Sequence, residues 1–152
     1  RCYYCYDAPC QTACPTGINV PSFIGMISQH NNHGAAGKIL TENIMGGTCA
    51  RACPVETLCE QACVRNHEDD GPVRIGMLQR YATDQASQDQ VSFFTRAEPT
   101  GHSVAVVGAG PAGLACAHAM AVLGHDVVIY EAQAKAGGLN EYGLSCWYVL
   151  CP

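Results

Sequence analysis

Hydrophobic residues recur at helical spacing through the first part of the chain. Apolar side chains three and four positions apart predict amphipathic helices at residues 20–30, 35–43 and 72–90. Residues 1–19 carry prolines and a glycine at short intervals, which predicts an irregular loop. Residues 91–101 lack this spacing and predict a linker. The first part of the chain is therefore expected to be helical.

The pattern changes beyond the linker. Residues 103–107 form a short, mostly β-branched run, which is typical of a buried parallel strand. Residues 114–123 are rich in small apolar residues and predict a helix that ends at Gly124. Residues 126–130 predict a second strand. The order strand, helix, strand is that of a βαβ unit, so an α/β domain is expected to begin here.

The two patterns divide the chain into domains. We predict a helical domain at residues 1–98, the beginning of an α/β domain at 99–144 and a short tail at 145–152. The 152 residues are 48% hydrophobic and 14% charged, as in folded globular proteins. A net charge of −5 without a run of lysine or arginine argues against nucleic-acid binding. No apolar run reaches membrane-spanning length, so no membrane is expected as a partner.

Eight of the eleven cysteines lie in the first 63 residues, in two clusters that each contain a Cys-Pro dipeptide. The clusters read Cys2-x2-Cys5-x4-Cys10-x3-Cys14-Pro15 and Cys49-x3-Cys53-Pro54-x4-Cys59-x3-Cys63. Disulfides, a structural zinc ion and iron–sulfur clusters are the three alternatives for so many sulfurs. An odd cysteine count and a nucleotide-binding pattern downstream argue against disulfides.

Iron–sulfur clusters explain the cysteine spacing best. Zinc favours paired Cys-x2-Cys motifs, whereas only one such motif occurs here and the sulfurs exceed the needs of one ion. Two-cluster ferredoxins wrap three close cysteines around one cluster and send a fourth, before a proline, to the other. Cys2, Cys5 and Cys10 fit the first role, and Cys14 fits the second. The many thiols do not show the pattern of a disulfide framework, which favours a reducing compartment, the cytoplasm.

A glycine-rich fingerprint follows the first predicted strand and opens the predicted helix. Its residues are Gly108, Ala109, Gly110, Pro111, Ala112 and Gly113. This context predicts a dinucleotide site, in which the pyrophosphate lies at the helix N-terminus. Glu131 ends the second strand, where an acid binds ribose hydroxyls and disfavours the 2′-phosphate of NADP. The alternative is a glycine-rich turn without a ligand, and the fingerprint alone does not choose FAD over NAD.

Several segments together resemble a known family over residues 1–144, and the tail at 145–152 diverges from that family. The matching segments are 2–15, 47–54, 58–63 and 71–79. They resemble the N-terminal iron–sulfur region of dihydropyrimidine dehydrogenase, which also occurs in the small subunit of bacterial glutamate synthase. The resemblance implies an α-helical ferredoxin-like [4Fe-4S] domain followed by the start of a Rossmann-type FAD-binding domain.

The resemblance also implies the cofactor ligands. One [4Fe-4S] cluster would take Cys2, Cys5, Cys10 and Cys63, and the second would take Cys14, Cys53, Cys59 and Gln79. The glutamate synthase branch usually has glutamate where this chain has Gln79, so the residue favours the pyrimidine branch. Cys49 receives no iron and is expected to be a small buried apolar residue. The loop with Gly138 and Leu139 would touch the FAD.

The function implied by the resemblance is electron input. Electrons would pass from NAD(P)H through FAD and two clusters to an FMN-containing, pyrimidine-reducing partner in a hetero-oligomer. The NAD(P)H domain and the FMN barrel are missing, so the chain is expected to be a fragment. Alternatives are the glutamate synthase small subunit or a related NADPH oxidoreductase, a ferredoxin-like electron carrier, and an inactive fragment.

Overall fold

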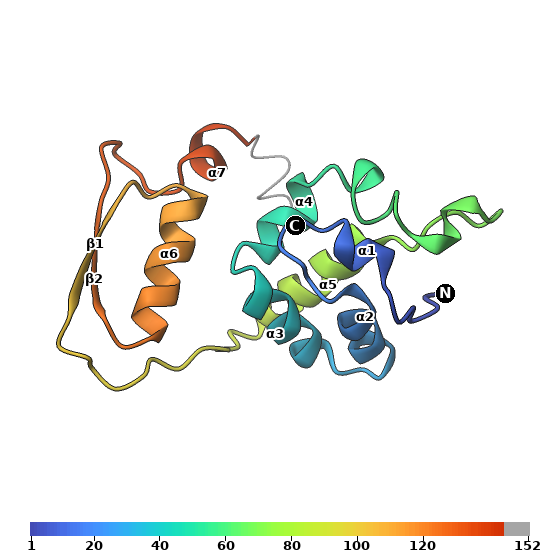
Figure 1. Cartoon of the computed structure of the whole chain (residues 1–152), viewed down its shortest axis with the longest axis horizontal. Coiled ribbons are helices and arrows are strands. Elements are labelled where there is room, and N and C mark those ends of the chain that lie inside the picture. The colour runs from blue at the N-terminus through green and yellow to red at the C-terminus, as the bar shows by residue number, and fades with distance from the viewer. Residues whose placement is uncertain (145–152) are drawn as a thin grey trace. The chain divides into compact units, whose positions relative to one another are not determined.

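The computed structural model describes residues 1–144, so the predicted tail at 145–152 lies outside the described residues. The chain divides into two compact units, Arg1–Val91 and Ser92–Pro152. The first unit is helical, and the second contains a two-stranded parallel sheet (Figure 1).

The described chain alternates short helices with loops before it reaches the sheet. The helices of the first unit are α1 (Pro9–Thr12), α2 (Val20–Ser28), α3 (Asn32–Glu42), α4 (Gly46–Ala52) and α5 (Ile75–Gln88), with single 3-10 turns η1 (Val55–Thr57) and η2 (Val64–His67). The second unit contains β1 (Ser103–Val107), α6 (Pro111–Val122), β2 (Asp126–Tyr130) and α7 (Leu139–Tyr142).

The core of the first unit lies where α2 and α4 pack around α3 and α5. Phe23 and Ile39 are fully buried, as is Ile75 at the start of α5. The side chain of Asn19 accepts a hydrogen bond from the backbone N–H of Ser22, and this cap fixes the start of α2. The helices predicted at residues 20–30, 35–43 and 72–90 are confirmed as α2, α3 and α5, with shifted ends.

Helix α4 is not among the helices that the hydrophobic spacing predicts. Gly46 is its first residue and is buried. A Cβ atom at Gly46 would collide with the side chain of Ile39. The glycine therefore serves close packing between helices rather than a turn, and it lets α4 carry the second group of cysteines toward α5.

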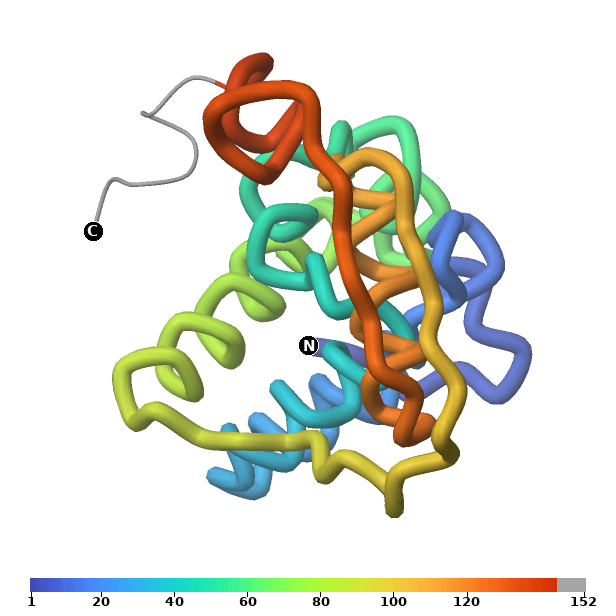
Figure 2. The backbone as a smooth tube through the Cα atoms, turned by 90° about the vertical axis from the view of Figure 1, so that its left-hand side faces the viewer, coloured from blue at the N-terminus to red at the C-terminus, as the bar shows by residue number. Residues whose placement is uncertain are grey.

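The second unit is a βαβ unit in which β1 and β2 are parallel neighbours, from Ser103 opposite Asp126 to Val107 opposite Tyr130 (Figure 2). Helix α6 packs against both strands, and Val106 is buried. The side chains at the alternate strand positions are exposed to solvent; Val107, for example, is 87% exposed. The prediction of a fully buried strand is therefore wrong within the described residues, because a single helix covers the sheet.

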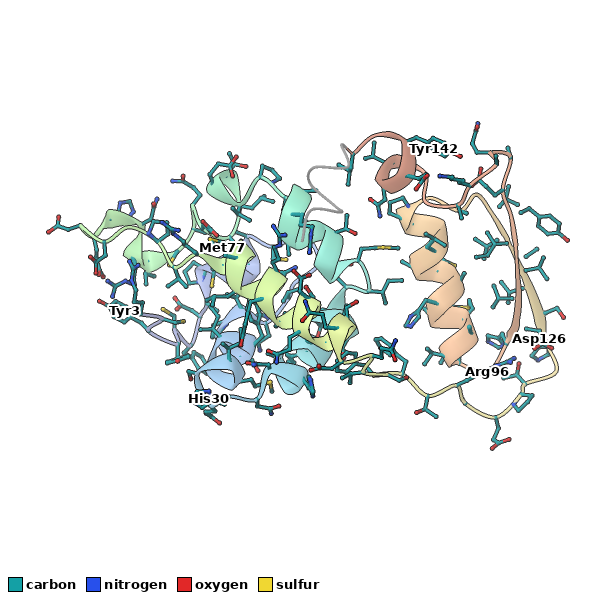
Figure 3. The ribbon with its side chains drawn as sticks, turned by 180° about the vertical axis from the view of Figure 1, so that it is seen from behind. Tyr3, His30, Met77, Arg96, Asp126 and Tyr142 are labelled. Atoms are coloured by element: carbon teal, nitrogen blue, oxygen red, sulfur yellow. The ribbon has the colours of Figure 1, made fainter. Side chains whose placement is uncertain are left out.

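The segment before β1 packs with the second unit, so the two units divide earlier than the predicted boundary at 98/99. The backbone N–H of Ala97 donates to the carbonyl of Val122 at 2.9 Å. Arg96 pairs with Asp126 at 2.6 Å, and both side chains are labelled in Figure 3. Within residues 1–144, none of the helices combines the length and the apolarity that crossing a bilayer requires.

Candidate metal centres and nucleotide loop

Cysteines from both ends of the opening segment line one pocket. This pocket, called the Cys10 pocket below, contains Cys2, Cys5, Cys10 and Cys63. Helix α1 and the loop before it supply the first three, and the residue that precedes η2 supplies the fourth. The structure thus brings Cys63 to the cysteines that lie more than fifty residues earlier, as the resemblance implies.

The remaining cysteines of the segment line a second pocket. This Cys53 pocket contains Cys14, Cys49, Cys53, Cys59 and Gln79. Cys53 caps the C-terminus of α4, and Gln79 lies on the second turn of α5. All the predicted metal-ligating side chains therefore gather in two pockets, and Cys14 is separated from the other cysteines of its own sequence cluster.

The arrangement of the sulfurs suits a cluster better than a single ion. The cysteines of residues 1–144 are free thiols. Within the same residues, no three histidine, cysteine or acidic side chains converge closely enough to hold one metal ion. Zinc needs its sulfurs at about 2.3 Å from one point. The cysteines instead surround cavities, as ligands of a larger iron–sulfur core do.

Three of the pocket thiols have raised pKa values. Burial, followed by the nearby Cys63 thiolate, raises the pKa of Cys10 to about 11. Burial, followed by the charge of Cys49, raises the pKa of Cys53 to about 12. Burial, followed by the carboxylate of Glu60, raises the pKa of Cys59 to about 11. These thiols hold their protons at neutral pH, so iron must displace the protons when it binds.

Cys14 behaves in the opposite way. Burial acts to raise its pKa, but hydrogen bonds from the Thr16 hydroxyl and from the backbone N–H groups of Thr16, Gly17 and Ile18 lower it overall. These donors stabilise a thiolate. Cys14 is therefore the sulfur of the Cys53 pocket that is best prepared to meet a metal.

Gln79 is buried rather than placed on a helix surface, with 7% of the residue exposed. Its Nε2 donates to the carbonyl of Gly46 at 2.8 Å. Because the nitrogen is engaged by the backbone, the amide oxygen is the atom that remains for a metal. The glycine at position 46 contributes to this contact, since it lets α4 approach α5.

Cys49 differs from its prediction as a buried apolar residue. It is half-buried, lines the Cys53 pocket, and its Sγ accepts a hydrogen bond from Asn43 Nδ2 at 3.1 Å. Its thiol is also hydrogen-bonded with Cys53. Sequence reasoning missed Asn43 and Arg65, the latter of which lines the Cys10 pocket. No spacing rule in a single sequence marks either residue.

The predicted nucleotide residues gather at the N-terminus of α6. Gly108 has a φ of 96°, which suits glycine, and a Cβ at Gly113 would collide with the carbonyl oxygen of Gly108. The backbone N–H of Gly137 donates to Ala109 at 2.8 Å. A Cβ at Gly138 would lie 2.7 Å from the Cα of Gly110, so the second loop packs on the first.

The remaining residues of the predicted nucleotide site lie around the same loop. Pro111 and Ala112 form the first turn of α6, and Leu139 is exposed at the start of α7. Glu131 accepts hydrogen bonds from the backbone N–H groups of Gln133 at 2.8 Å and Ala109 at 2.7 Å. Those bonds, in that order, lower the pKa of the Glu131 carboxyl. The acid thus lies at the edge of the glycine-rich loop and is ionised.

Comparison with known proteins identifies a family for each of the two parts of the chain. Residues 1–91 match the family described as dihydropyrimidine dehydrogenase domain II, 4Fe-4S cluster. Residues 106–141 match the NAD(P)-binding Rossmann-like domain. The chain is 42% identical over 144 residues to the NAD-dependent dihydropyrimidine dehydrogenase subunit PreT of Salmonella typhimurium and of Escherichia coli K12.

These alignments cover 95% of this chain but 35% of each relative, so the chain spans about a third of the length of the curated relatives. The family match includes both cysteine pockets, and the Rossmann match includes the glycine-rich loop. An iron–sulfur domain is thus followed by the start of a Rossmann-like NAD(P)-binding domain. Since the first match covers more than half of the chain, this protein belongs to the 4Fe-4S family of dihydropyrimidine dehydrogenase domain II.

Proposed function

We propose that this chain is part of the electron-input subunit of an NAD(P)H-dependent dihydropyrimidine dehydrogenase. Electrons pass from NAD(P)H through FAD and two [4Fe-4S] clusters to an FMN-containing partner subunit that reduces the pyrimidine. The chain does this as part of a longer polypeptide in a hetero-oligomer, in the reducing environment of the cytoplasm. Its relatives carry the name NAD-dependent dihydropyrimidine dehydrogenase subunit PreT.

The observation that carries the proposal is the exchange of cysteines between the two pockets. Cys63 joins Cys2, Cys5 and Cys10, whereas Cys14 joins Cys53 and Cys59. This crossed arrangement supports two separate clusters, because each pocket has enough donors for one. We assign Cys2, Cys5, Cys10 and Cys63 to one cluster, and Cys14, Cys53, Cys59 and Gln79 to the other.

The protein's own residues hold and tune these groups. A bound cluster supplies a site that accepts and releases one electron. The thiolates fix each cluster and exclude other ligands. Gln79 offers a neutral oxygen where a fourth thiolate would add negative charge, and lower negative charge makes reduction easier. No residue of the chain is assigned as a general acid or a nucleophile.

The glycine-rich loop binds the pyrophosphate of FAD in this proposal. Gly110 has nothing within 4 Å of a Cβ position, so its backbone is open to a phosphate. The N–H groups of the first turn of α6 and its dipole favour the negative charge. Glu131 orients the ribose hydroxyls, while Gly138 and Leu139 close the loop. The choice of FAD over NAD rests on the position of this unit directly after the iron–sulfur domain in the family.

Metal and flavin analysis of anaerobically purified protein tests the proposal. We expect about eight irons per chain, with matching sulfide and the broad visible absorbance of [4Fe-4S] clusters. Zinc in place of iron, or about four irons after careful reconstitution, would contradict the two-cluster assignment. Iron without flavin in the longer protein would favour the ferredoxin-like carrier over the electron-input subunit.

The variant Gly110→Ala tests the nucleotide loop separately. Since the added methyl meets no protein atom within 4 Å and the backbone φ is −74°, the fold should persist. The methyl would occupy the approach of the pyrophosphate, so flavin content should fall by roughly tenfold or more while iron stays unchanged. Unchanged flavin binding, measured by fluorescence after release, would refute the assignment of this loop. Gly113→Ala is the matched variant. Its added methyl would collide with the carbonyl oxygen of Gly108, so this variant should lose the loop conformation in addition to the flavin.

A further inference from the structure

We propose that Arg65 is a charged hydrogen-bond donor to the iron–sulfur cluster of the Cys10 pocket and raises the reduction potential of that cluster. This inference rests on the proposed function, because it requires a cluster in that pocket. It goes further, since Arg65 belongs to neither set of assigned ligands.

Arg65 has an unusual position for an arginine. It follows Cys63 by two residues in η2, is 9% exposed, and lines the Cys10 pocket beside Cys2 and Cys5. Arginine is almost never fully buried unless its donors are paired. A guanidinium placed against a cavity of sulfurs therefore needs an explanation.

One end of the guanidinium is held firmly. Nη2 lies 3.0 Å from Glu68 and 3.3 Å from Asp70. The Cζ atom lies 4.9 Å from the ring centre of Tyr3, which is labelled in Figure 3, and the Tyr3 hydroxyl donates to Glu68 at 3.2 Å. Both carboxylates have side chains that reach solvent, so water screens their charge. They fix the outer end of the side chain and leave the inner end available.

The inner end carries a donor without a partner. Nε of Arg65 is buried and has no hydrogen-bond partner among the described residues. Leaving such a donor unpaired in the protein interior is unfavourable, because it has lost its hydrogen bonds to water. The cavity that Arg65 lines is bounded by cysteine sulfurs, and the sulfurs of an iron–sulfur cluster accept hydrogen bonds. A cluster in the Cys10 pocket would therefore provide the missing acceptor.

The consequence is a change in reduction potential. Reduction adds one negative charge to a cluster that four thiolates already make negative. A positive donor stabilises the reduced state more than the oxidised state, and hydrogen bonds to the sulfurs are one of the levers on potential. Loss of the donor should lower the reduced-to-oxidised ratio at a fixed potential by about tenfold, which is about 59 mV for a one-electron couple.

Redox titration of the anaerobic protein, followed by electron paramagnetic resonance, tests the inference on Arg65→Gln. The midpoint of the cluster in the Cys10 pocket should fall, and the midpoint of the other cluster should stay where it is. Arg65→Lys keeps the charge but lacks Nε, so its midpoint should lie between those of Arg65→Gln and the parent. Equal midpoints in the parent and Arg65→Gln would overturn the proposal.

Arg51→Gln is the matched control. Arg51 is half-buried, its Nε is also buried without a hydrogen-bond partner, and its Nη2 pairs with Asp84 at 2.6 Å. Among the described residues it lines neither cysteine pocket. Its replacement should lower stability without moving either midpoint. Equal shifts in both arginine variants would overturn the proposal, because they would reflect general loosening of the fold.

A measurement on the parent protein does not depend on the variants. Pulsed electron paramagnetic resonance of the reduced clusters, with nitrogen-15 in the arginines, should show a nitrogen-15 coupling that is absent from unlabelled protein. The absence of any arginine coupling would overturn the proposal even if Arg65→Gln fails to load a cluster. Protein that holds no iron at all would instead refute the proposed function.

Discussion

The two cysteine pockets are built from different kinds of structure. The Cys10 pocket is made by loops and single turns, and two residues of its loop, Tyr4 and Ala8, have positive φ angles of 54° and 31°. The Cys53 pocket is framed by α4 and α5, from which Cys49 and Gln79 project. The helical frame is fixed by an apolar core, whereas the loop frame depends more on the cluster that it surrounds.

In the proposed assignment the two pockets would reduce the negative charge of a cluster in different ways. In the Cys10 pocket all four assigned ligands are thiolates, and the proposed compensating group is the cation of Arg65. In the Cys53 pocket Gln79 stands in place of one thiolate, and the neighbouring donor is the neutral amide of Asn43. The proposed assignment therefore predicts two different ways of lowering the negative charge: a cation outside the ligand set in one pocket, and a neutral ligand within it in the other.

The largest expected effect is loss of one cluster without the other. Cys63→Ala removes the ligand that joins the two ends of the opening segment, so this variant should lose about half of its iron. Cys49→Ala, the matched control in the other pocket, should keep its iron, because Cys49 is a neighbour rather than an assigned ligand. Iron and sulfide analysis of both variants measures this difference. Loss of iron from Cys49→Ala would make Cys49 a ligand and contradict the assignment of Gln79.

The sequence identified the side chains that gather in the two pockets better than it identified the residues around them. Cysteine spacing indicated clusters, and the helical period located α2, α3 and α5, because both signals are local. The start of α4 at Gly46 was missed, because packing against Ile39 rather than turn chemistry explains that glycine. Arg65 and Asn43 were missed because their roles arise only when distant segments meet.

The exposed strands of the second unit show the same limit. A β-branched run predicts a strand correctly, but burial depends on what packs against it. Val107 and Tyr130 are exposed because α6 covers the alternate positions. A period in the sequence therefore fixes which residues share a face, while neighbouring elements decide whether that face is buried.

Gln79 provides the next largest effect and sharpens the contrast in ligand charge. Gln79→Glu places a carboxylate against the cluster of the Cys53 pocket. The added negative charge should lower the midpoint of that cluster by about 59 mV or more, which corresponds to a tenfold change in the reduced-to-oxidised ratio. Gln79→Ala should make that cluster labile to oxygen. Spectroscopic redox titration should show the Cys10-pocket midpoint unchanged in Gln79→Glu. Equal spectra of Gln79→Glu and the parent protein would contradict ligation by Gln79.

The pKa shifts predict a difference in thiol reactivity in iron-free protein. Cys14 has a lowered pKa, whereas burial raises that of Cys10 to about 11. The thiolate reacts with alkylating agents, so Cys14 should be labelled roughly tenfold faster than Cys10 at pH 8. The difference should shrink as the pH rises toward 11, where Cys10 also ionises. Mass spectrometry of peptides after short labelling measures both rates, and equal rates at pH 8 would contradict the predicted difference.

The smallest expected effect concerns Asn43, whose amide touches Cys49 rather than an assigned ligand. Asn43 Nδ2 donates to the Cys49 sulfur at 3.1 Å, and the Cys49 thiol is hydrogen-bonded with Cys53. Asn43→Asp keeps the oxygen that accepts from the backbone N–H of Met45 at 2.9 Å, so the end of α3 should stay intact. It removes the donor and adds a negative charge, so its effect should reach the cluster through the two hydrogen bonds and also through space.

We therefore expect Asn43→Asp to lower the midpoint of the Cys53-pocket cluster by less than Gln79→Glu does. In Cys49→Ala, where the connecting sulfur is absent, the same change at Asn43 should have a smaller effect, because only the through-space charge remains. Redox titration of the four proteins of this double-mutant cycle measures the coupling. An equal shift in both backgrounds would mean that Asn43 acts by charge alone, and a shift of the Cys10-pocket midpoint would show that the two pockets are not independently tuned.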